Sequence, residues 1–174
     1  AWAVVAGESL DTRGSLRQSV LSNVLFDNES APVKRALVEA GLADDVRGFS
    51  QSLQQDMTGV RLGNAKDGSQ EEFVRIVEET LEAELEKGLS KDELLATLNR
   101  IEYIRRECGG YPTRGIIYGI DAFDTWLYDG DPFAALRFDE DFAALREEVQ
   151  AGAFEDHARR IYLENPHKLG LRLT

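Results

Sequence analysis

Apolar residues recur along the chain with two different periods, and the shorter period, simple alternation, predicts strands. Residues 1–6 form a short, β-prone apolar run closed by Gly7, which predicts a buried strand. Between residues 45 and 65 apolar and polar positions alternate on either side of a turn predicted at 54–56, so we expect a pair of antiparallel strands there. The same alternation predicts a closing strand at Leu169, Leu171 and Leu173.

The longer period is helical, and it predicts most of the remaining chain. The clearest stripes lie in residues 69–87 and 90–108, and each is preceded by a serine three positions before an acidic residue, the spacing of a helix-capping box. Gly88 and Gly109-Gly110 end these two helices. Further helices are expected at residues 12–27, 32–41, 113–129, 138–149 and 154–161.

The helix expected over residues 113–129 has two notable features. Its apolar positions fall at i, i+4, i+7 and i+11, and Gly115 and Gly119 lie one turn apart on it. A pair of glycines lets another backbone approach closely, either within the core or at a binding face. We expect packing in the core. The apolar stripe comprises Ile116, Ile120, Phe123 and Leu127.

The order of elements is a strand, two helices, two strands, several helices and a final strand. Strands that adjoin in sequence favour an antiparallel or mixed sheet, with the helices gathered on one face. We therefore predict an α+β domain with a sheet of about four or more strands, covered on one face by several helices. The 174 residues read as one domain. The chain enters its first strand at Ala1 without a Met, which is typical of a segment of a longer polypeptide.

Composition narrows the classes of partner. The chain has 32 acidic and 20 basic residues and a formal net charge of −12, which repels phosphate backbones and anionic lipids, so we expect neither nucleic acid nor a membrane as partner. The longest apolar runs are far too short to span a bilayer. A single cysteine, Cys108, excludes an intrachain disulfide and favours a reducing compartment, so we expect a soluble, cytoplasmic protein.

The sequence is poor in metal ligands. A zinc site needs three or four His, Cys or carboxylate side chains, commonly with two of them on one helical turn. The chain has only His157 and His167, with a predicted helix end and a proline between them. A site built from His157 with Glu155 or Asp156 is conceivable, but we expect His157 to be a surface histidine on a helix.

Nucleophilic and phosphate-binding motifs are also missing. There is no Gly-x-Ser-x-Gly elbow, and Gly109-Gly110 lacks the lysine and serine of a P-loop. Arg105 and Arg106 would lower the pKa of the Cys108 thiol, whereas the C-terminal end of a helix would raise it. We expect a core or half-buried cysteine.

Two acidic clusters admit a structural explanation. Asp129-Gly130-Asp131 resembles part of a calcium loop, but Pro132 follows it and the other ligand positions are not filled, so a tight turn is expected. Asp139-Glu140-Asp141 precedes a predicted helix, where solvated carboxylates interact favourably with the helix dipole. No set of residues is predicted to be catalytic.

One segment resembles a known family. Residues 115–133 (GIIYGIDAFDTWLYDGDPF), preceded by Arg114, resemble the presequence-protease branch of the insulinase (pitrilysin) type zinc peptidases. Three further segments resemble the same family in the same order: residues 31–42, residues 97–107 and residues 162–167. The resemblance therefore extends over almost the whole chain.

The resemblance implies a mitochondrial-processing-peptidase-like domain inside a larger enzyme. Such peptidases have two bowl-like halves, each of two related α+β domains, around a chamber for unfolded peptides. An inverted His-x-x-Glu-His zinc motif belongs to the first domain, and this chain resembles the second, non-catalytic one. The Arg and Tyr that the family's last domain offers to substrate have no counterpart near residues 37–42. No cofactor is expected in this chain, and zinc is expected in the parent's first domain.

The implied role is a wall of the peptide chamber, braced against neighbouring domains, and an acidic wall would favour peptides rich in Lys and Arg. One alternative is a scaffold of the same fold that has lost the zinc motif. Another is a stand-alone peptide-binding module. In isolation, such a domain would expose the apolar surface that meets its neighbour, so self-association is also expected.

Overall fold

The computed structural model describes residues 1–107 and 112–173 of the chain. Within these ranges four strands form one sheet in the order β2-β3-β1-β4, and every neighbouring pair is antiparallel. The predicted α+β class is confirmed, and of the two predicted sheet types the antiparallel one is present. The strands are β1 (Trp2–Glu8), β2 (Asp45–Gln51), β3 (Gln55–Gly63) and β4 (Lys168–Gly170).

Two strand predictions need correction. The turn between β2 and β3 comes before Gln55, because Gln55 and Asp56 already pair with β1 and so belong to the strand. The closing strand is shorter than the leucine alternation predicts. Pairing with β1 covers only Lys168–Gly170, although the Leu171 amide still donates to the carbonyl of Ala1 at 2.9 Å.

The helices follow the predicted order closely. The helix predicted at 12–27 is α-helical as far as Ser22 and then continues as a wider π-helical turn, and the last predicted helix also widens in this way. The predicted end at Cys108-Gly109-Gly110 lies outside the described residues. The bounds are α1 (Thr12–Ser22), η1 (Asn23–Asp27), α2 (Pro32–Glu39), α3 (Gln70–Lys87), α4 (Lys91–Glu107), α5 (Arg114–Trp126), η3 (Ala134–Leu136), α6 (Asp139–Ala151), α7 (Ala153–Ala158) and η4 (Arg159–Leu163).

The two predicted capping serines behave differently. The hydroxyl oxygen of Ser90 accepts a hydrogen bond from the Glu93 amide at 3.3 Å, as a helix cap does. The hydroxyl of Ser69 instead donates to the carbonyl of Lys66 at 2.7 Å and makes no cap bond to α3. Both helices nevertheless begin where the pattern predicts.

The core lies between the sheet and the helices on one of its faces. At its centre Trp2 of β1, Phe26 of η1 and Tyr162 of η4 pack together, with ring centroids 5.3–6.4 Å apart. All three are almost fully buried, and the side-chain amide of Gln18 donates to the Tyr162 hydroxyl. The first strand, the first long helical segment and the last helix of the chain therefore meet at one point.

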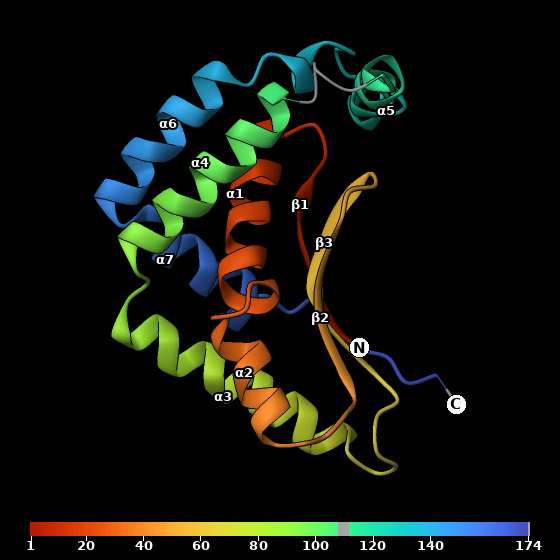
Figure 1. The fold of residues 1–174 in the computed structure, drawn as a ribbon, viewed down its shortest axis with the longest axis vertical. Coiled ribbons are helices and arrows are strands. Elements are labelled where there is room, and N and C mark those ends of the chain that lie inside the picture. The colour runs from red at the N-terminus through yellow and green to blue at the C-terminus, as the bar shows by residue number, and fades with distance from the viewer. Residues whose placement is uncertain (108–111, 174) are drawn as a thin grey trace.

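The helices are distributed unevenly around the sheet. Figure 1 shows α1, α2, α3, α4, α6 and α7 on one side of the strands, as predicted for a sheet covered on one face. Helix α5 is separate from this layer and lies beyond one end of the strands, whereas the N- and C-termini lie toward the other end. The second face of the sheet is left open.

Candidate interaction surfaces

The two histidines do not form a metal site with other residues. His157 lies on α7, whereas His167 lies in the exposed segment after η4. Across residues 1–107 and 112–173, no three His, Cys, Asp or Glu side chains are grouped closely enough to hold a metal ion. Within the same residues, no helix has both the length and the apolar character needed to cross a bilayer.

His157 is more enclosed than predicted. The sequence favours a surface histidine, but the ring is half-buried, and its Nε2 atom is buried without a hydrogen-bond partner. Burial lowers the pKa of His157 to about 4, and the nearby positive charges of Arg17 and Arg160 contribute to the lowering. His157 is therefore neutral at pH 7, and its half-buried ring contributes to the packing of α7 against the domain.

The calcium-like fragment forms a turn, as expected. The Asp131 carboxylate accepts the amide of Phe133 at 2.9 Å and pairs with Arg137. The guanidinium of Arg137 lowers the pKa of the Asp131 carboxyl, and the Phe133 amide contributes. A side chain at Gly130 would collide with Leu10, so the tight turn itself requires glycine. Cys108, Gly109 and Gly110 lie outside the described residues.

The acidic run at the start of α6 is only partly solvated. Asp139 and Glu140 are exposed, in agreement with the prediction. Asp141, by contrast, has a side chain only 14% exposed, accepts the Thr12 hydroxyl at 3.0 Å and pairs with Arg13 at 3.1 Å. This residue therefore ties α6 to α1, a contact between positions far apart in sequence.

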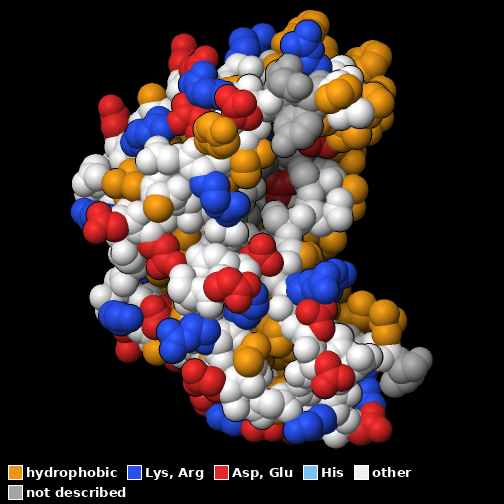
Figure 2. Space-filling model, viewed as in Figure 1, with side chains coloured by type: hydrophobic (Ala, Val, Ile, Leu, Met, Phe, Trp, Pro, Cys, Tyr) orange, Lys and Arg blue, Asp and Glu red, His pale blue; other side chains and the backbone are white. Residues whose placement is uncertain are grey.

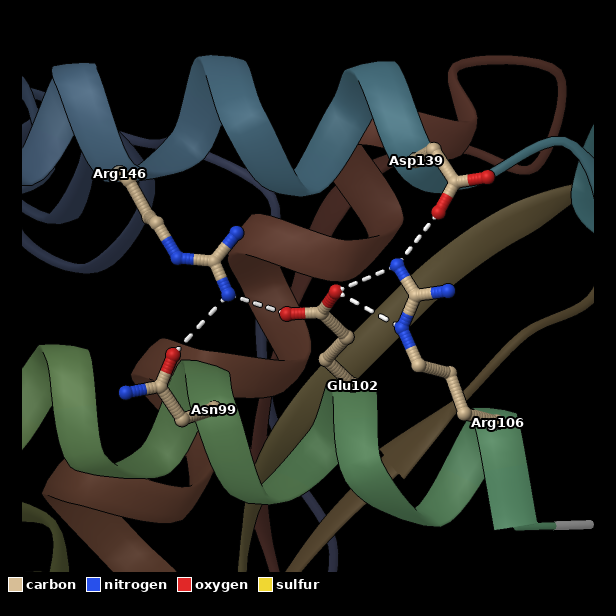
Figure 3. Close-up of polar contacts among 5 residues, drawn as sticks. All are labelled: Asn99, Glu102, Arg106, Asp139 and Arg146. Carbon is tan, nitrogen blue, oxygen red and sulfur yellow. Dashed lines mark hydrogen bonds and ion pairs between the residues drawn. The ribbon is translucent and has the colours of Figure 1, made fainter.

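A second ionic cluster joins α4 to α6 (Figure 3). The Glu102 carboxylate accepts hydrogen bonds from Arg106, at 2.7 and 2.9 Å, and from Arg146. Arg146 also donates to Asn99 at 3.0 Å, and Arg106 reaches Asp139 at the start of α6. Desolvation opposes ionisation of Glu102, but the two arginines outweigh it and lower the pKa of this carboxyl. The bonds of Glu102 and Asn99 to Arg146, and of Arg106 to Asp139, cross from α4 to α6, so the cluster is a structural brace.

The open face of the sheet is the first candidate interaction surface. The strand register places Phe49, Gly59, Ala3 and Leu169 side by side across all four strands, and this row is largely apolar. Two residues along, Arg47 and Arg61 are paired directly opposite each other and are exposed. Figure 2 shows the molecule hollowed on this side, below α5.

Helix α5 is the second candidate surface, and it corrects the sequence-based expectation. The predicted stripe exists, but it points away from the domain: Ile116 and Leu127 are each 66% exposed and Trp126 is 59% exposed. Side chains added at Gly115 or Gly119 would meet no atom of residues 1–107 and 112–173 within 4 Å, so these glycines do not pack in the described core. Hydrophobic side chains gather over α5 in Figure 2.

The opposite side of α5 faces the domain and carries three polar residues, Asp121, Asp124 and Thr125, beside the half-buried Ile117. Thr125 is 1% exposed, and its hydroxyl donates to the carbonyl of Asp131 at 2.7 Å. Burial raises the pKa values of the Asp121 and Asp124 carboxyls, and repulsion from Asp121 and Asp56 adds to the effect at Asp124. The helix therefore buries its carboxylates partly and exposes most of its large apolar residues.

The hollows among the described residues do not resemble a closed active site. A cleft lined by Ser9, Ser15 and Asp124, under α5, has a volume of about 40 Å³, far below the several hundred Å³ of typical ligand sites. A groove of about 670 Å³ lies between residues 61–70 and the segment 171–173, beside Ala1. It opens next to both chain ends and contains no grouping of catalytic side chains that we identify.

The comparisons with known proteins establish the family. Residues 2–101 match the model of the Peptidase M16 inactive domain, and since this is more than half of the chain, the chain belongs to that family. The chain is 35% identical over 166 residues to Protein HypA of Clostridium perfringens, and 26% identical over 178 residues to presequence protease 1 of Arabidopsis thaliana. The predicted resemblance to the presequence-protease branch is confirmed.

These relatives are much longer than the chain. The matches cover 94% and 98% of the chain but only 17% and 16% of the two relatives. Solved structures agree on the fold. The inactive peptidase domain of a presumed zinc protease from Bordetella parapertussis has a TM-score of 0.74 at 16% identity, over 99% of this chain and 90% of that one. An M16-like peptidase from Alicyclobacillus acidocaldarius has a TM-score of 0.65, and the match covers 38% of it.

Proposed function

We propose that this chain is the non-catalytic domain of a longer zinc endopeptidase that degrades unfolded peptides, and that it forms part of the chamber wall. Relatives named presequence protease and structural neighbours described as zinc proteases support the chemistry of the parent. The chain covers only 17% and 16% of the lengths of two curated relatives, which supports a parent with further domains. Zinc is proposed to bind in the parent's first domain, with no catalytic or metal residue in this chain.

The observation that carries the proposed role is the sheet with one open face. Six helices cover the other face, so the open face is the one available to a chamber (Figure 1). Its row of apolar side chains and its two arginines offer contacts to an extended peptide without any catalytic group. Both charge signs are present on this face, since Arg47 and Arg61 are exposed on it and Arg47 pairs with Asp45 of the same strand at 2.9 Å. The lone cysteine favours a reducing location, which we propose is the cytoplasm.

The zinc chemistry is tested by comparing the 174-residue chain with the longer protein that contains it. The proposal expects an inverted zinc motif about one domain-length upstream, bound zinc in the longer protein, and peptide cleavage that a chelator abolishes. The isolated chain should neither bind zinc nor cleave peptide. Stoichiometric zinc and unaided cleavage by the isolated chain would overturn the proposal, and a longer protein without the motif would favour the scaffold alternative.

The wall role is tested by charge reversal on the open face. In the longer protein, Arg47→Glu with Arg61→Glu should lower kcat/KM for an acidic unfolded peptide more than for a basic one, because the reversed charges repel the former. A matched control is Arg75→Glu with Lys87→Glu on α3, which changes the net charge equally on the helical side. Equal effects of the two pairs would contradict a wall at the sheet. Binding of unfolded peptide by the isolated chain with high affinity would favour a stand-alone module.

A further inference from the structure

Helix α5 is amphipathic, and its orientation is the reverse of the usual one. A surface helix of a globular domain normally turns its apolar stripe to the core and its charges to solvent. Here the stripe is outside, with Ile116 66%, Ile120 58%, Phe123 47% and Leu127 66% exposed. The side that lies against the domain carries Asp121, Asp124 and the buried Thr125, together with the half-buried Ile117.

This orientation is unfavourable for the domain alone. Partial burial raises the pKa values of both aspartates, which means that the domain destabilises their charged forms. The exposed stripe is extended by Trp126, which stacks on Phe123, and hydrophobic side chains gather over the helix as a patch rather than as scattered single residues (Figure 2). Such a patch is typical of a surface that another folded surface covers.

We propose that the outer side of α5, residues Ile116, Ile120, Phe123, Trp126 and Leu127 with Gly115 and Gly119, is the docking face for another domain of the same longer polypeptide. This inference rests on the proposed function, because it needs a parent with further domains. It adds the surface through which the non-catalytic domain is held.

Three observations favour a folded domain of the parent as the occupant. The matches cover only 16–17% of the lengths of the two curated relatives, so most of a parent of that length lies outside this chain. No charged residue belongs to the stripe, which fits an apolar partner surface. No atom of the part of the chain that the structure describes lies within 4 Å of where a Cβ of Gly115 or Gly119 would be, so a partner helix or strand can approach the α5 backbone closely.

The position of α5 supports the same occupant. It lies beyond one end of the sheet, whereas the chain termini lie toward the other end (Figure 1). A partner domain docked on α5 would lie over the α5 end of the sheet. The contact with the partner domain should be confined to α5, because the stripe runs along this single helix of 13 residues.

The test uses a photo-crosslinking amino acid in the longer protein. With Ile120 replaced by benzoylphenylalanine, irradiation should join position 120 to a residue of the same polypeptide outside these 174 residues. With Val38 replaced instead, a residue 57% exposed on α2, that crosslink should be absent. A crosslink from position 120 to a second copy, or only to added unfolded peptide, would contradict the proposal.

A stability measurement provides an independent readout. Gly119→Leu places a side chain where this domain leaves open space, so the isolated chain should unfold at an unchanged or slightly higher temperature. In the longer protein the same substitution should lower the unfolding temperature by several degrees, because it keeps the partner away. Equal behaviour in both proteins would overturn the docking face. Zinc content and peptide cleavage report separately on the proposed function, so a catalytically inactive parent with the crosslink would retain this inference and lose the other.

Discussion

Phe123 and Trp126 stack on the outer side of α5, with ring centroids 5.6 Å apart and planes inclined by 26°. Stacking recovers part of the apolar area that each ring would otherwise expose, yet Phe123 remains 47% and Trp126 59% exposed. Asp124, between them in sequence, lies on the domain side and lines the cleft beneath the helix. In this turn of α5 the aromatic side chains face outward and the carboxylate faces the domain, which is the reverse of a helix packed on a core.

Tryptophan fluorescence should report this orientation directly. The chain has two tryptophans, and Trp2 is 2% exposed whereas Trp126 is 59% exposed. A Trp2→Phe variant, which retains only Trp126, should emit at long wavelength and be quenched strongly by acrylamide. A Trp126→Phe variant should emit at shorter wavelength and be quenched several-fold less. The reverse ranking would contradict the outward orientation of α5.

Removing the charge of Asp124 should stabilise the isolated chain at neutral pH. The folded-state pKa of Asp124 is raised, so the folded state binds more protons than the unfolded state, and stability increases as pH falls through this range. Asp124→Asn should therefore unfold at a higher temperature than the wild type at pH 7. The gain in free energy of unfolding should be below about 1 kcal/mol, because solvent screens the partly exposed group.

The pH dependence of that gain is the critical measurement. Thermal unfolding followed by circular dichroism should show the difference shrinking as pH falls through the raised pKa of the Asp124 carboxyl, because the wild-type side chain then becomes neutral too. An exposed carboxylate, Glu82→Gln on α3, serves as the control and should show no such trend. A gain for Asp124→Asn that persists at low pH would indicate a cause other than its charge.

His157 should have the opposite dependence on pH. Its folded-state pKa of about 4 lies below the ordinary 6.5, so the unfolded state binds more protons between these values. The wild type should lose stability as pH falls from about 6.5 toward 4, and His157→Gln should lose about 1–2 kcal/mol less over the same range, after allowance for partial exposure. Urea unfolding at several pH values measures the difference. His167→Gln, at an exposed position, is the control and should follow the wild type.

Glu102→Gln should destabilise the contact between α4 and α6. The change keeps the size of the side chain but leaves Arg106 and Arg146 without their shared carboxylate, at an expected cost of about 1–2 kcal/mol. Glu79→Gln, which affects an exposed pair with Arg75 on α3, should cost at most about 0.5 kcal/mol. Denaturant unfolding compares them. An equally small effect of both substitutions would show that the cluster contributes no more than a surface pair.

Two glycines should respond oppositely to alanine. At Gly59 in β3 a Cβ would collide with the carbonyl oxygen of Trp2, so Gly59→Ala should cost about 2–3 kcal/mol. At Gly119 a Cβ meets nothing, and alanine favours the helix, so Gly119→Ala should stabilise the isolated chain by up to about 1 kcal/mol. Urea midpoints of the two variants measure this. Similar losses at both sites would show that Gly119 packs against the domain after all.

Much of the fold was predictable because the local pattern and the tertiary structure agree. The stripes of α3 and α4 point to the core, the run at residues 1–6 becomes the central strand β1, and the order of elements matches the antiparallel sheet. The family resemblance was readable in residues 115–133, which lie beyond the range that the family model matches but within the range shared with the curated relatives.

The candidate surfaces were less predictable. Asp141 was predicted to be solvated, and nothing in the sequence singled out Glu102, because the sequence does not reveal which arginine on a distant helix lies opposite each of them. His157 was predicted to lie at the surface, because its enclosure depends on how α7 packs against α1 and α6. Arg47 and Arg61 are cross-strand neighbours on the open face because of the register between β2 and β3, which the sequence does not reveal either.

The spacing of Ile116, Ile120, Phe123 and Leu127 is sufficient to predict an amphipathic helix, because periodicity is a property of local order. It does not say which way the helix turns. A stripe of the same composition is stabilised equally well by its own core or by another domain, and the choice follows from contacts between residues far apart in the chain. Here those contacts hold Thr125 and the two aspartates against the domain, so folding directs the carboxylates inward and leaves the four residues of the stripe facing out.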